Sequence, residues 1–325
     1  MDVILPAAGL GTRVRPQTWS KPKPLVSVGG KPILAHVIER VLPLDPAQIV
    51  YITGYLGDQI REWAQRTYDR PQAFVVQPEM KGQTDAILRC REVVRDDALI
   101  VFPDSVFETD FSPLQTLDAD AALFTIAFDD PSPFGVAVKE GGRVTRLVEK
   151  PREPISKEVL MGIYYVKRMP DLYAAIEEQM RRDIQLKGEF FIADAFQLMI
   201  DGGARFVTLP VTVWEDCGSI EGLLQTNRYV LDHYPTAPPP ARPDVAIVQP
   251  SVVPASATLE RAVIGPYAAL GEGVVVRDAV VRDSIVEDGA TIEGTVIEHS
   301  VIGRKATIVG RAHRLNAGDA SQVEL

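Results

Sequence analysis

Short apolar runs alternate with amphipathic stretches along the first two thirds of the chain. Branched and aromatic residues predict strands at Val3–Ala7, Ile49–Thr53, Phe74–Gln77, Leu99–Phe102 and Ala122–Phe128. Between these runs the spacing of apolar residues predicts helices at Pro32–Leu42, Asp58–Thr67 and Thr84–Val94. This alternation is typical of an α/β fold with a doubly wound, mainly parallel sheet. In such a sheet ligands bind at the carboxyl ends of the strands.

The pattern changes after Phe134. The run Val136–Val138 is followed by Gly141-Gly142 and then by a second alternating run, Val144–Val148. Two glycines between alternating runs indicate a β-hairpin. We therefore expect an antiparallel insertion on the parallel sheet.

Beyond residue 243 a branched apolar residue recurs every five or six positions. The repeating residues are Val253, Leu259, Ile264, Leu270, Val276, Val281, Val286, Ile292, Ile297, Ile302 and Ile308. One inward aliphatic residue per short strand and turn is typical of a parallel β-helix. Eleven such positions at three per coil predict three to four coils. So short a solenoid leaves sheet edges to cover, which favours docking on the first domain or a homo-oligomer that involves the β-helix.

The two patterns divide the chain into domains. The segment 235–243 holds five prolines in nine residues. Proline fixes φ and removes a backbone donor, so this segment is expected to be an extended linker. The predicted domains are residues 1–234, the linker 235–243 and the β-helix 244–325.

Composition excludes several classes of protein. Apolar residues make up 46% and charged residues 24% of the chain, so it is not a largely disordered protein. No apolar run is long enough to cross a bilayer. With only Cys90 and Cys217, a disulfide scaffold and a four-cysteine zinc site are excluded. The net charge of −10 argues against nucleic acid and anionic membranes as partners. We expect a reduced, cytoplasmic protein.

The first forty residues are basic although the chain is acidic. Six basic side chains stand there against two acidic ones, and three of the cations lie among glycines and prolines. The buried run Val3–Ala7 leads into a turn that contains Gly9 and Gly11. Glycines let backbone N–H groups approach an anion closely. A small anionic ligand is therefore expected at this turn.

Three interpretations of the glycine turn compete. A dinucleotide fold needs a third glycine and an immediate helix, but Pro16 follows the turn. A P-loop needs Gly-Lys-Ser/Thr, which is absent. A bare turn does not require the continuation Thr12-Arg13, Pro16, Thr18, Pro22-Lys23-Pro24-Leu25 and Lys31-Pro32. This whole string resembles the signature of the sugar-1-phosphate nucleotidyltransferases. With its tail, the chain is most similar to the long, Rossmann-like form of glucose-1-phosphate thymidylyltransferase that ends in a left-handed β-helix.

The resemblance implies a role for individual residues. Arg13 and Lys23 would be catalytic, acting on the triphosphate. The nucleotide would be bound by Ala8, Gly9, Gly11, Thr12, Gln77 and Gly82, the last two reading the base. The sugar phosphate would be bound by Gly135, Glu149, Lys150 and Gly162. Asp104 and Asp216 would jointly hold Mg²⁺, which needs only one or two carboxylates beside phosphate oxygens and water. Asp85 is interpreted as a charge at a helix N-terminus.

The resemblance also implies the activity. The expected reaction converts an NTP, dTTP or UTP by preference, and a sugar 1-phosphate, glucose 1-phosphate by preference, to an NDP-sugar and pyrophosphate. Two alternatives stay open. The β-helix could in addition acetylate an amino-sugar phosphate, with His299 and His313 as the available bases. The chain could also be a non-catalytic nucleotide-sugar sensor.

Overall fold

The computed structural model describes residues 1–153, 155–234, 236 and 242–310. Two compact units emerge from the contacts within the chain. The first comprises residues 1–26 and 31–223, and the second comprises residues 27–30 and the chain from 224 onward. The predicted linker 235–243 lies mostly outside the described residues, as do His313 and the end of the chain. Each unit is described by itself.

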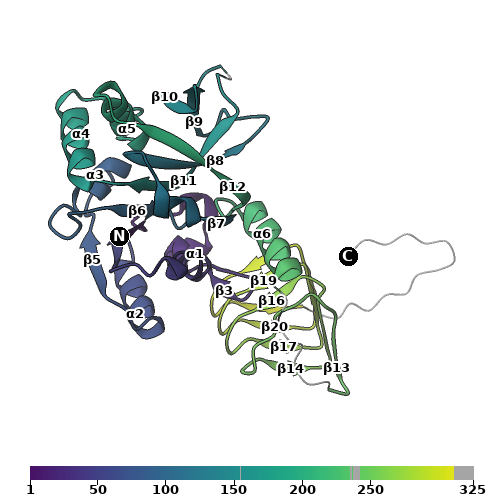
Figure 1. Cartoon of the computed structure of the whole chain (residues 1–325). Coiled ribbons are helices and arrows are strands. Elements are labelled where there is room, and N and C mark those ends of the chain that lie inside the picture. Colours follow the sequence, from purple (N-terminus) through teal and green to yellow (C-terminus); the bar gives the residue numbers. More distant parts are fainter. Residues whose placement is uncertain (154, 235, 237–241, 311–325) are drawn as a thin grey trace. The chain divides into compact units, whose positions relative to one another are not determined.

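The first unit is built on one mixed sheet. Its strand order is β5-β4-β1-β6-β11-β8-β12-β7, and the hairpin β9–β10 joins it through β11 (Figure 1). The strands are β1 (Asp2–Pro6), β4 (Ile49–Thr53), β5 (Gln72–Val76), β6 (Ala98–Val101), β7 (Ser105–Thr109), β8 (Ala121–Ala127), β9 (Gly135–Glu140), β10 (Arg143–Glu149), β11 (Glu158–Val166) and β12 (Phe206–Asp216). A small ribbon of β2 (Ser27–Val28) and β3 (Lys31–Pro32) stands apart.

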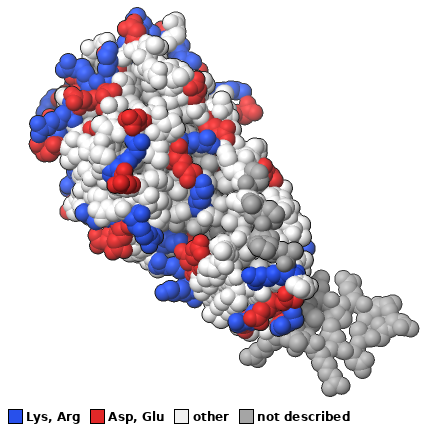
Figure 2. Space-filling view, turned by 60° about the horizontal axis from the view of Figure 1, so that its bottom comes forward, with Lys and Arg blue, Asp and Glu red and all other residues white. Residues whose placement is uncertain are grey.

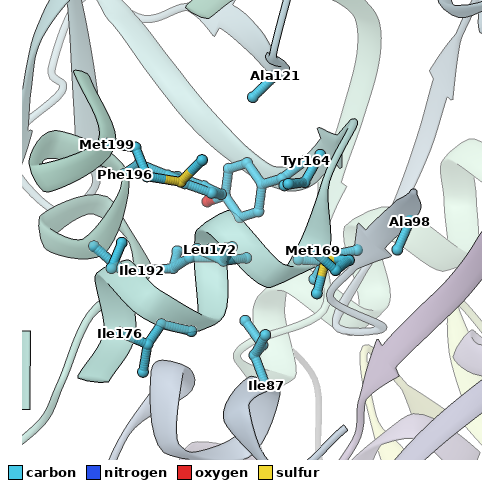
Figure 3. Packing of buried hydrophobic residues seen from close by; sticks show 14 of the residues in the cluster. Ile87, Ala98, Ala121, Tyr164, Met169, Leu172, Ile176, Ile192, Phe196 and Met199 are labelled. Atoms are coloured by element: carbon cyan, nitrogen blue, oxygen red, sulfur yellow. The ribbon is translucent and has the colours of Figure 1, made fainter. Parts of the chain in front are cut away.

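Helices cover both faces of this sheet. They are α1 (Ile33–Val41), α2 (Gly57–Thr67), α3 (Gln83–Leu88), α4 (Met169–Arg181) and α5 (Ile192–Asp201), whereas most of α6 (Ile220–His233) belongs to the second unit. Successive residues of a strand point to opposite faces, so Ile4 and its neighbour Leu5 belong to different core clusters. Leu172 and Phe196, from α4 and α5, pack on one face (Figure 3). The helices α1 and α2 supply the core of the other face.

The predicted α/β class is confirmed. All five predicted strands are present within two residues of their expected ends, and β5, β4, β1 and β6 run parallel to one another. The antiparallel hairpin is present as β9–β10. One feature was not predicted. β11 is antiparallel to both β6 and β8, so it separates the parallel half of the sheet from the remaining strands.

The second unit contains a parallel β-helix, as the periodicity predicted. Eleven short strands stack into three sheets of four, four and three. They are β13 (Val245–Ile247), β14 (Thr258–Glu260), β15 (Ala262–Ile264), β16 (Ala268–Leu270), β17 (Val275–Arg277), β18 (Val280–Arg282), β19 (Ser284–Val286), β20 (Thr291–Glu293), β21 (Val296–Glu298), β22 (Val301–Ile302) and β23 (Thr307–Val309). Seven of the repeating aliphatic residues lie fully inside, among them Ile264 and Val281.

The unit also includes the turn Ser27–Gly30. The Gly29 amide donates to Asn227 Oδ1 of α6 over 2.8 Å, and Asn227 Nδ2 donates to the carbonyl of Tyr267 over 3.1 Å. The Ser27 amide donates to Glu287 Oε1 over 2.9 Å. Turn, helix and β-helix therefore share one hydrogen-bonded network.

Charges are mixed over the surface. On the face that Figure 2 presents, blue and red side chains are interspersed over most of the described surface. Many of them form ion pairs such as Arg261–Asp278 and Arg282–Glu298. Among the described residues, none of the helices combines the length and the apolar character that crossing a bilayer requires.

The β-helix offers a direct test of which residues point inward. Ile264 is fully buried, whereas its neighbour Val263 on β15 is 36% exposed. Ile264→Ala should lower the free energy of unfolding of this unit by about 3 kcal/mol, because it removes buried methyl groups and leaves a cavity. Val263→Ala is the matched control and should cost less than about 1 kcal/mol. Chemical denaturation measures both, and equal losses would contradict the assigned faces.

Candidate active site

The glycine turn follows β1 at the carboxyl end of the parallel strands. Gly11 has φ +61°, and a Cβ there would lie 2.9 Å from Lys23 Cβ and 3.0 Å from Thr18 Cγ2. The Thr18 hydroxyl also donates to the Gly11 carbonyl over 2.8 Å. Position 11 therefore requires glycine, both for its left-handed backbone and for close packing. Thr18 belongs to the motif because it fastens the turn.

A cavity of about 320 Å³ opens beside this turn. Nine of the fourteen predicted site residues line it. They are Ala8, Gly9, Gly11, Thr12, Arg13, Lys23, Gln77, Gly82 and Asp104. The other five, Gly135, Glu149, Lys150, Gly162 and Asp216, are not part of its lining. Of these five, Asp216, Lys150 and Gly162 each contact a residue that does line the cavity.

Two aspartates come together at the end of β12. The register of β12 with β7 sets Asp216 opposite Ser105, and the Cys217 amide donates to the Asp104 carbonyl over 3.2 Å. Antiparallel pairing thus brings residue 216 beside residue 104 at one edge of the sheet.

Two cations lie at the same edge. Lys23 Nζ lies 3.4 Å from Asp104 Oδ2. The buried Gly218 lines the cavity, and a Cβ there would lie 2.8 Å from Asp216 Oδ1 and 3.0 Å from Arg13 Nη2. The side chains of Arg13 and Asp216 therefore lie on either side of Gly218, and a larger residue at position 218 would clash with both.

These carboxylates fit a hard divalent cation. Within the described residues there is no group of three or more His, Cys, Asp or Glu that could hold a metal. Mg²⁺ does not need one, because it prefers oxygen ligands and completes its shell with phosphate oxygens and water. The side chain of Asp104 is 54% exposed, so its oxygens are open to such a shared ion. The donor set therefore suits Mg²⁺ that arrives with a polyphosphate.

Gln77 and Gly82 also line the cavity. Gln77 follows β5 and is 3% exposed. Gly82 has φ +108°, and a Cβ there would lie 2.4 Å from the backbone nitrogen of Phe190. The segment that contains Phe190 is thereby pressed against the Gln77–Gly82 loop, and the Phe190 amide donates to the Lys81 carbonyl over 3.2 Å.

Two of the four predicted sugar-phosphate residues, Lys150 and Gly162, lie next to residues of the cavity wall. Glu149 is opposite Gly135 in the β9–β10 hairpin, where a Cβ on Gly135 would lie 2.8 Å from Glu149 Oε2. Lys150 Nζ stands 4.7 Å from the ring centroid of Phe191. Gly162 accepts a hydrogen bond from the Phe102 amide over 2.9 Å. Phe191 and Phe102 both line the cavity. Lys150, which follows the hairpin, and Gly162 of β11 are therefore each one residue away from it.

Burial raises the pKa values of two carboxylates on this side. Burial raises the pKa of Glu149 above its ordinary value; Lys150 works against the shift, and the carboxylates of Asp194 and Glu189 add to it. Burial likewise raises the pKa of Asp194. Burial also raises the pKa of the Tyr164 hydroxyl, and the charges of Glu149 and Asp104 add to that effect. The hairpin and the aspartate edge therefore act electrostatically on one buried tyrosine.

Several residues of the site were not predicted. Phe102, Glu189 and Phe191 line the cavity, although none of them was predicted as a site residue. Asp85 was interpreted as a helix charge, but it binds Gln77 and Arg89. The signal for Asp85 was its i, i+4 spacing from Arg89.

Phe134, the residue before β9, belongs to an aromatic cluster. The Phe134 ring stacks on Phe128 at 5.8 Å and meets Trp214 edge-on at 5.6 Å. Trp214 lies on β12, two residues before Asp216. A hydroxyl would be poorly placed in this aromatic cluster, which supports the end of β12.

Comparison with known proteins agrees with this geometry. A family model described as "Nucleotidyl transferase" matches residues 2–233. The chain is 31% identical to UTP–glucose-1-phosphate uridylyltransferase AglF of Haloferax volcanii, over 66% of this chain and 89% of the relative. It is 29% identical to glucose-1-phosphate thymidylyltransferase of Streptomyces griseus, over 86% of this chain and 85% of the relative.

Other matches are partial or more distant. The chain is 32% identical to the bifunctional protein GlmU of Methanocaldococcus jannaschii, but it spans only 55% of that relative's length. A solved structure from Bacillus anthracis, described as a glucose-1-phosphate thymidylyltransferase with bound sucrose, superimposes with a TM-score of 0.62 at 26% identity. That match covers 70% of this chain and 94% of the other. A UDP-glucose pyrophosphorylase complexed with UDP-glucose, at 21% identity and a TM-score of 0.59, shares the fold.

The raised pKa of Glu149 predicts a pH-dependent cost in stability. Because its pKa is higher in the folded than in the unfolded chain, ionisation destabilises the fold as pH rises through the folded pKa. Glu149→Gln should therefore raise Tm by a few degrees at pH 8 without ligands, and the gain should vanish near pH 4. Differential scanning calorimetry measures this. The exposed Glu140→Gln on the same hairpin is the control, and a gain independent of pH would contradict the cause given.

Proposed function

The chain belongs to the nucleotidyl transferase family and is a sugar-1-phosphate nucleotidyltransferase; we propose that it uses dTTP or UTP, with Mg²⁺, and prefers glucose 1-phosphate. The observation that carries this proposal is that Arg13, Lys23, Asp104 and Gln77 line a single cavity, with Asp216 beside its lining residue Gly218. A polyphosphate at the charged end and a base at the amide end would fit this arrangement.

The transfer is a displacement at phosphorus. An ionised oxygen of the sugar phosphate attacks the α-phosphorus of the NTP, the bond from that phosphorus to the bridging oxygen breaks, and pyrophosphate leaves. The attacking oxygen is already charged at neutral pH, so no general base is needed. The obstacle is repulsion between two anions, which alignment and positive charge overcome.

Cations of the chain would meet this need at two places. Lys23 would lie against the α-phosphate, where charge develops during attack, and Arg13 with the amides of the glycine turn would hold the leaving pyrophosphate. Asp104 and Asp216 would hold Mg²⁺, which when bound supplies charge neutralisation across the phosphate oxygens. Lys23 also stands beside Asp104, so its position depends on that carboxylate.

The sugar would face the β9–β10 hairpin. Glu149 in its ionised form accepts hydrogen bonds from sugar hydroxyls, and Gly135 leaves room for close contact. Lys150 would bind the sugar's phosphate, with Phe191 beneath it. Names of relatives support this assignment, since two of them are glucose-1-phosphate enzymes.

Two variants test the charged end. Lys23→Ala and Asp104→Ala should each lower kcat by more than about tenfold while the fold stays intact, because each removes charge at the reacting phosphates. Pyrophosphate release at saturating Mg²⁺ measures the rate. Lys31→Ala is the matched control, since Lys31 lies in the same basic segment but is exposed and paired with Glu39 at 2.8 Å. Near wild-type rates in either test variant would refute its role.

The substrates are tested by crossing nucleotides with sugars. dTTP, UTP, CTP, ATP and GTP are each combined with glucose, mannose and N-acetylglucosamine 1-phosphates, and pyrophosphate is measured. We expect the highest kcat/KM with dTTP or UTP and glucose 1-phosphate, and loss of activity with EDTA that Mg²⁺ restores. Absence of turnover with every pair would favour the sensor alternative over an enzyme.

Acetyl transfer by the β-helix stays a prediction. His299 Nδ1 lies 2.8 Å from Asp283 Oδ2, but the same carboxylate is held by two hydrogen bonds from Arg228. His313 lies outside the described residues. An incubation with acetyl-CoA and glucosamine 1-phosphate decides the matter.

We also propose that a second copy of the chain covers one face of the β-helix. Along the sheet β13-β15-β18-β21, the register aligns Ala246, Val263, Val280 and Val296. These residues point outward, and Val296 is 61% exposed. An apolar row on a flat sheet face is suited to self-association.

Light scattering tests the association. The wild-type chain should have the mass of an oligomer, and Val296→Lys should shift it toward the monomer by placing a charge in the contact. Val309→Lys serves as control, because Val309 is similarly exposed at 60% but lies on β23 of a different sheet. A monomeric wild-type chain would refute the proposal.

A further inference from the structure

The amide of Gln77 is held from one side by two acceptors. Its Nε2 donates to the Gly82 carbonyl over 3.0 Å and to Asp85 Oδ2 over 2.9 Å. A primary amide has two N–H donors, and both are used here. Gln77 is nearly buried and lines the cavity.

Asp85, in the first turn of α3, is in turn fixed by Arg89, which directly follows that helix. Arg89 Nε donates to Asp85 Oδ2 over 3.0 Å, and Arg89 Nη2 donates to Asp85 Oδ1 over 3.2 Å. Such a two-bonded pair holds the carboxylate in one orientation. The side chain of Asp85 is only 12% exposed, so water competes weakly for it.

This arrangement decides which end of the amide meets a ligand. A carbonyl oxygen and a carboxylate can only accept hydrogen bonds, so the Gln77 atom that faces them must be nitrogen. Turning the amide over would set its oxygen against two acceptors. Both N–H groups of Gln77 are therefore occupied, and its Oε1 atom, an acceptor, is the group that can bind a ligand.

We propose that Asp85 and Arg89 are positioning residues that make the base end of the cavity an acceptor site. Such a site selects nucleobases with a ring N–H on the pairing edge, as in uracil and thymine. It disfavours cytosine and adenine, which present a ring nitrogen that itself accepts. This inference rests on the proposed function, in which Gln77 faces the base.

A helix charge alone would explain less. An acidic residue in the first turn of a helix is stabilising wherever its side chain points. Asp171 is such a residue, in the first turn of α4 and 3.0 Å from Arg168 Nε, far along the chain from the cavity. A purely structural role for Asp85 predicts lower stability and an equal effect on every nucleotide. A positioning role predicts an effect that depends on the base.

The test compares UTP with CTP, which differ only on the pairing edge. Wild-type protein should bind UTP more tightly than CTP by about a hundredfold. The ring nitrogen of cytosine is an acceptor, so with CTP the buried Gln77 Oε1 would be left without a hydrogen-bond donor. In Asp85→Asn the side-chain amide can donate to Gln77 as well as accept from it, so only the Gly82 carbonyl still opposes turning the Gln77 amide over. The UTP-to-CTP ratio should fall by about tenfold or more, mainly through KM for the nucleotide.

Two measurements are made on the full-length chain. Calorimetric titration with each nucleotide and Mg²⁺ gives the Kd ratio without turnover, and pyrophosphate release with glucose 1-phosphate gives the ratio of kcat/KM. Arg89→Gln should lower both ratios in the same direction but less. Asp171→Asn should leave both ratios unchanged. Should Asp85→Asn fail to fold, Arg89→Gln carries the test.

The outcomes separate this inference from the function on which it rests. If no nucleotide supports pyrophosphate release, the proposed function fails. If the wild-type enzyme selects UTP or dTTP but Asp85→Asn and Arg89→Gln both keep the wild-type ratio, the positioning role is wrong while the function stands. A wild-type preference for CTP or ATP would overturn the acceptor site itself.

Discussion

The pairing of β7 with β12 is the interaction on which the site depends. It sets Ser105 opposite Asp216 across more than a hundred residues of chain, and the Cys217 amide extends the contact to the Asp104 carbonyl. Two carboxylates that are remote in sequence thereby share one edge of the sheet. Since the strands are antiparallel, the start of one necessarily meets the end of the other.

Close backbone packing then brings positive charge to the same edge. Gly11 admits Lys23 and Thr18 to within contact of its backbone, and Gly218 leaves no side chain between Arg13 and Asp216. A larger residue at either position would separate the groups that the chemistry needs together. The preorganised charges of the site thus depend on two glycines, Gly11 and Gly218, as well as on the charged side chains themselves.

Burial has different effects on Glu149 in the β9–β10 hairpin and on the amide of Gln77. At the hairpin, burial makes the charge on Glu149 unfavourable, and a sugar hydroxyl bound there, as we propose, would satisfy it. At the base end, burial strengthens the chain of hydrogen bonds from Arg89 through Asp85 to Gln77. The first arrangement favours binding at the expense of stability, and the second fixes the orientation of a neutral group.

Much of this protein was determined by local pattern. The apolar runs predicted five strands, the five-to-six-residue period predicted the β-helix, and the string from Gly9 to Lys23 predicted the cavity, because burial period and turn chemistry are properties of neighbouring residues. Only tertiary structure decided the rest. The antiparallel entry of β11, the cavity wall at Phe102 and Phe191, and the bond from Gln77 to Asp85 all depend on which distant segments meet. The period of apolar residues in a sequence predicts which residues are buried, but it does not predict which distant residues they contact.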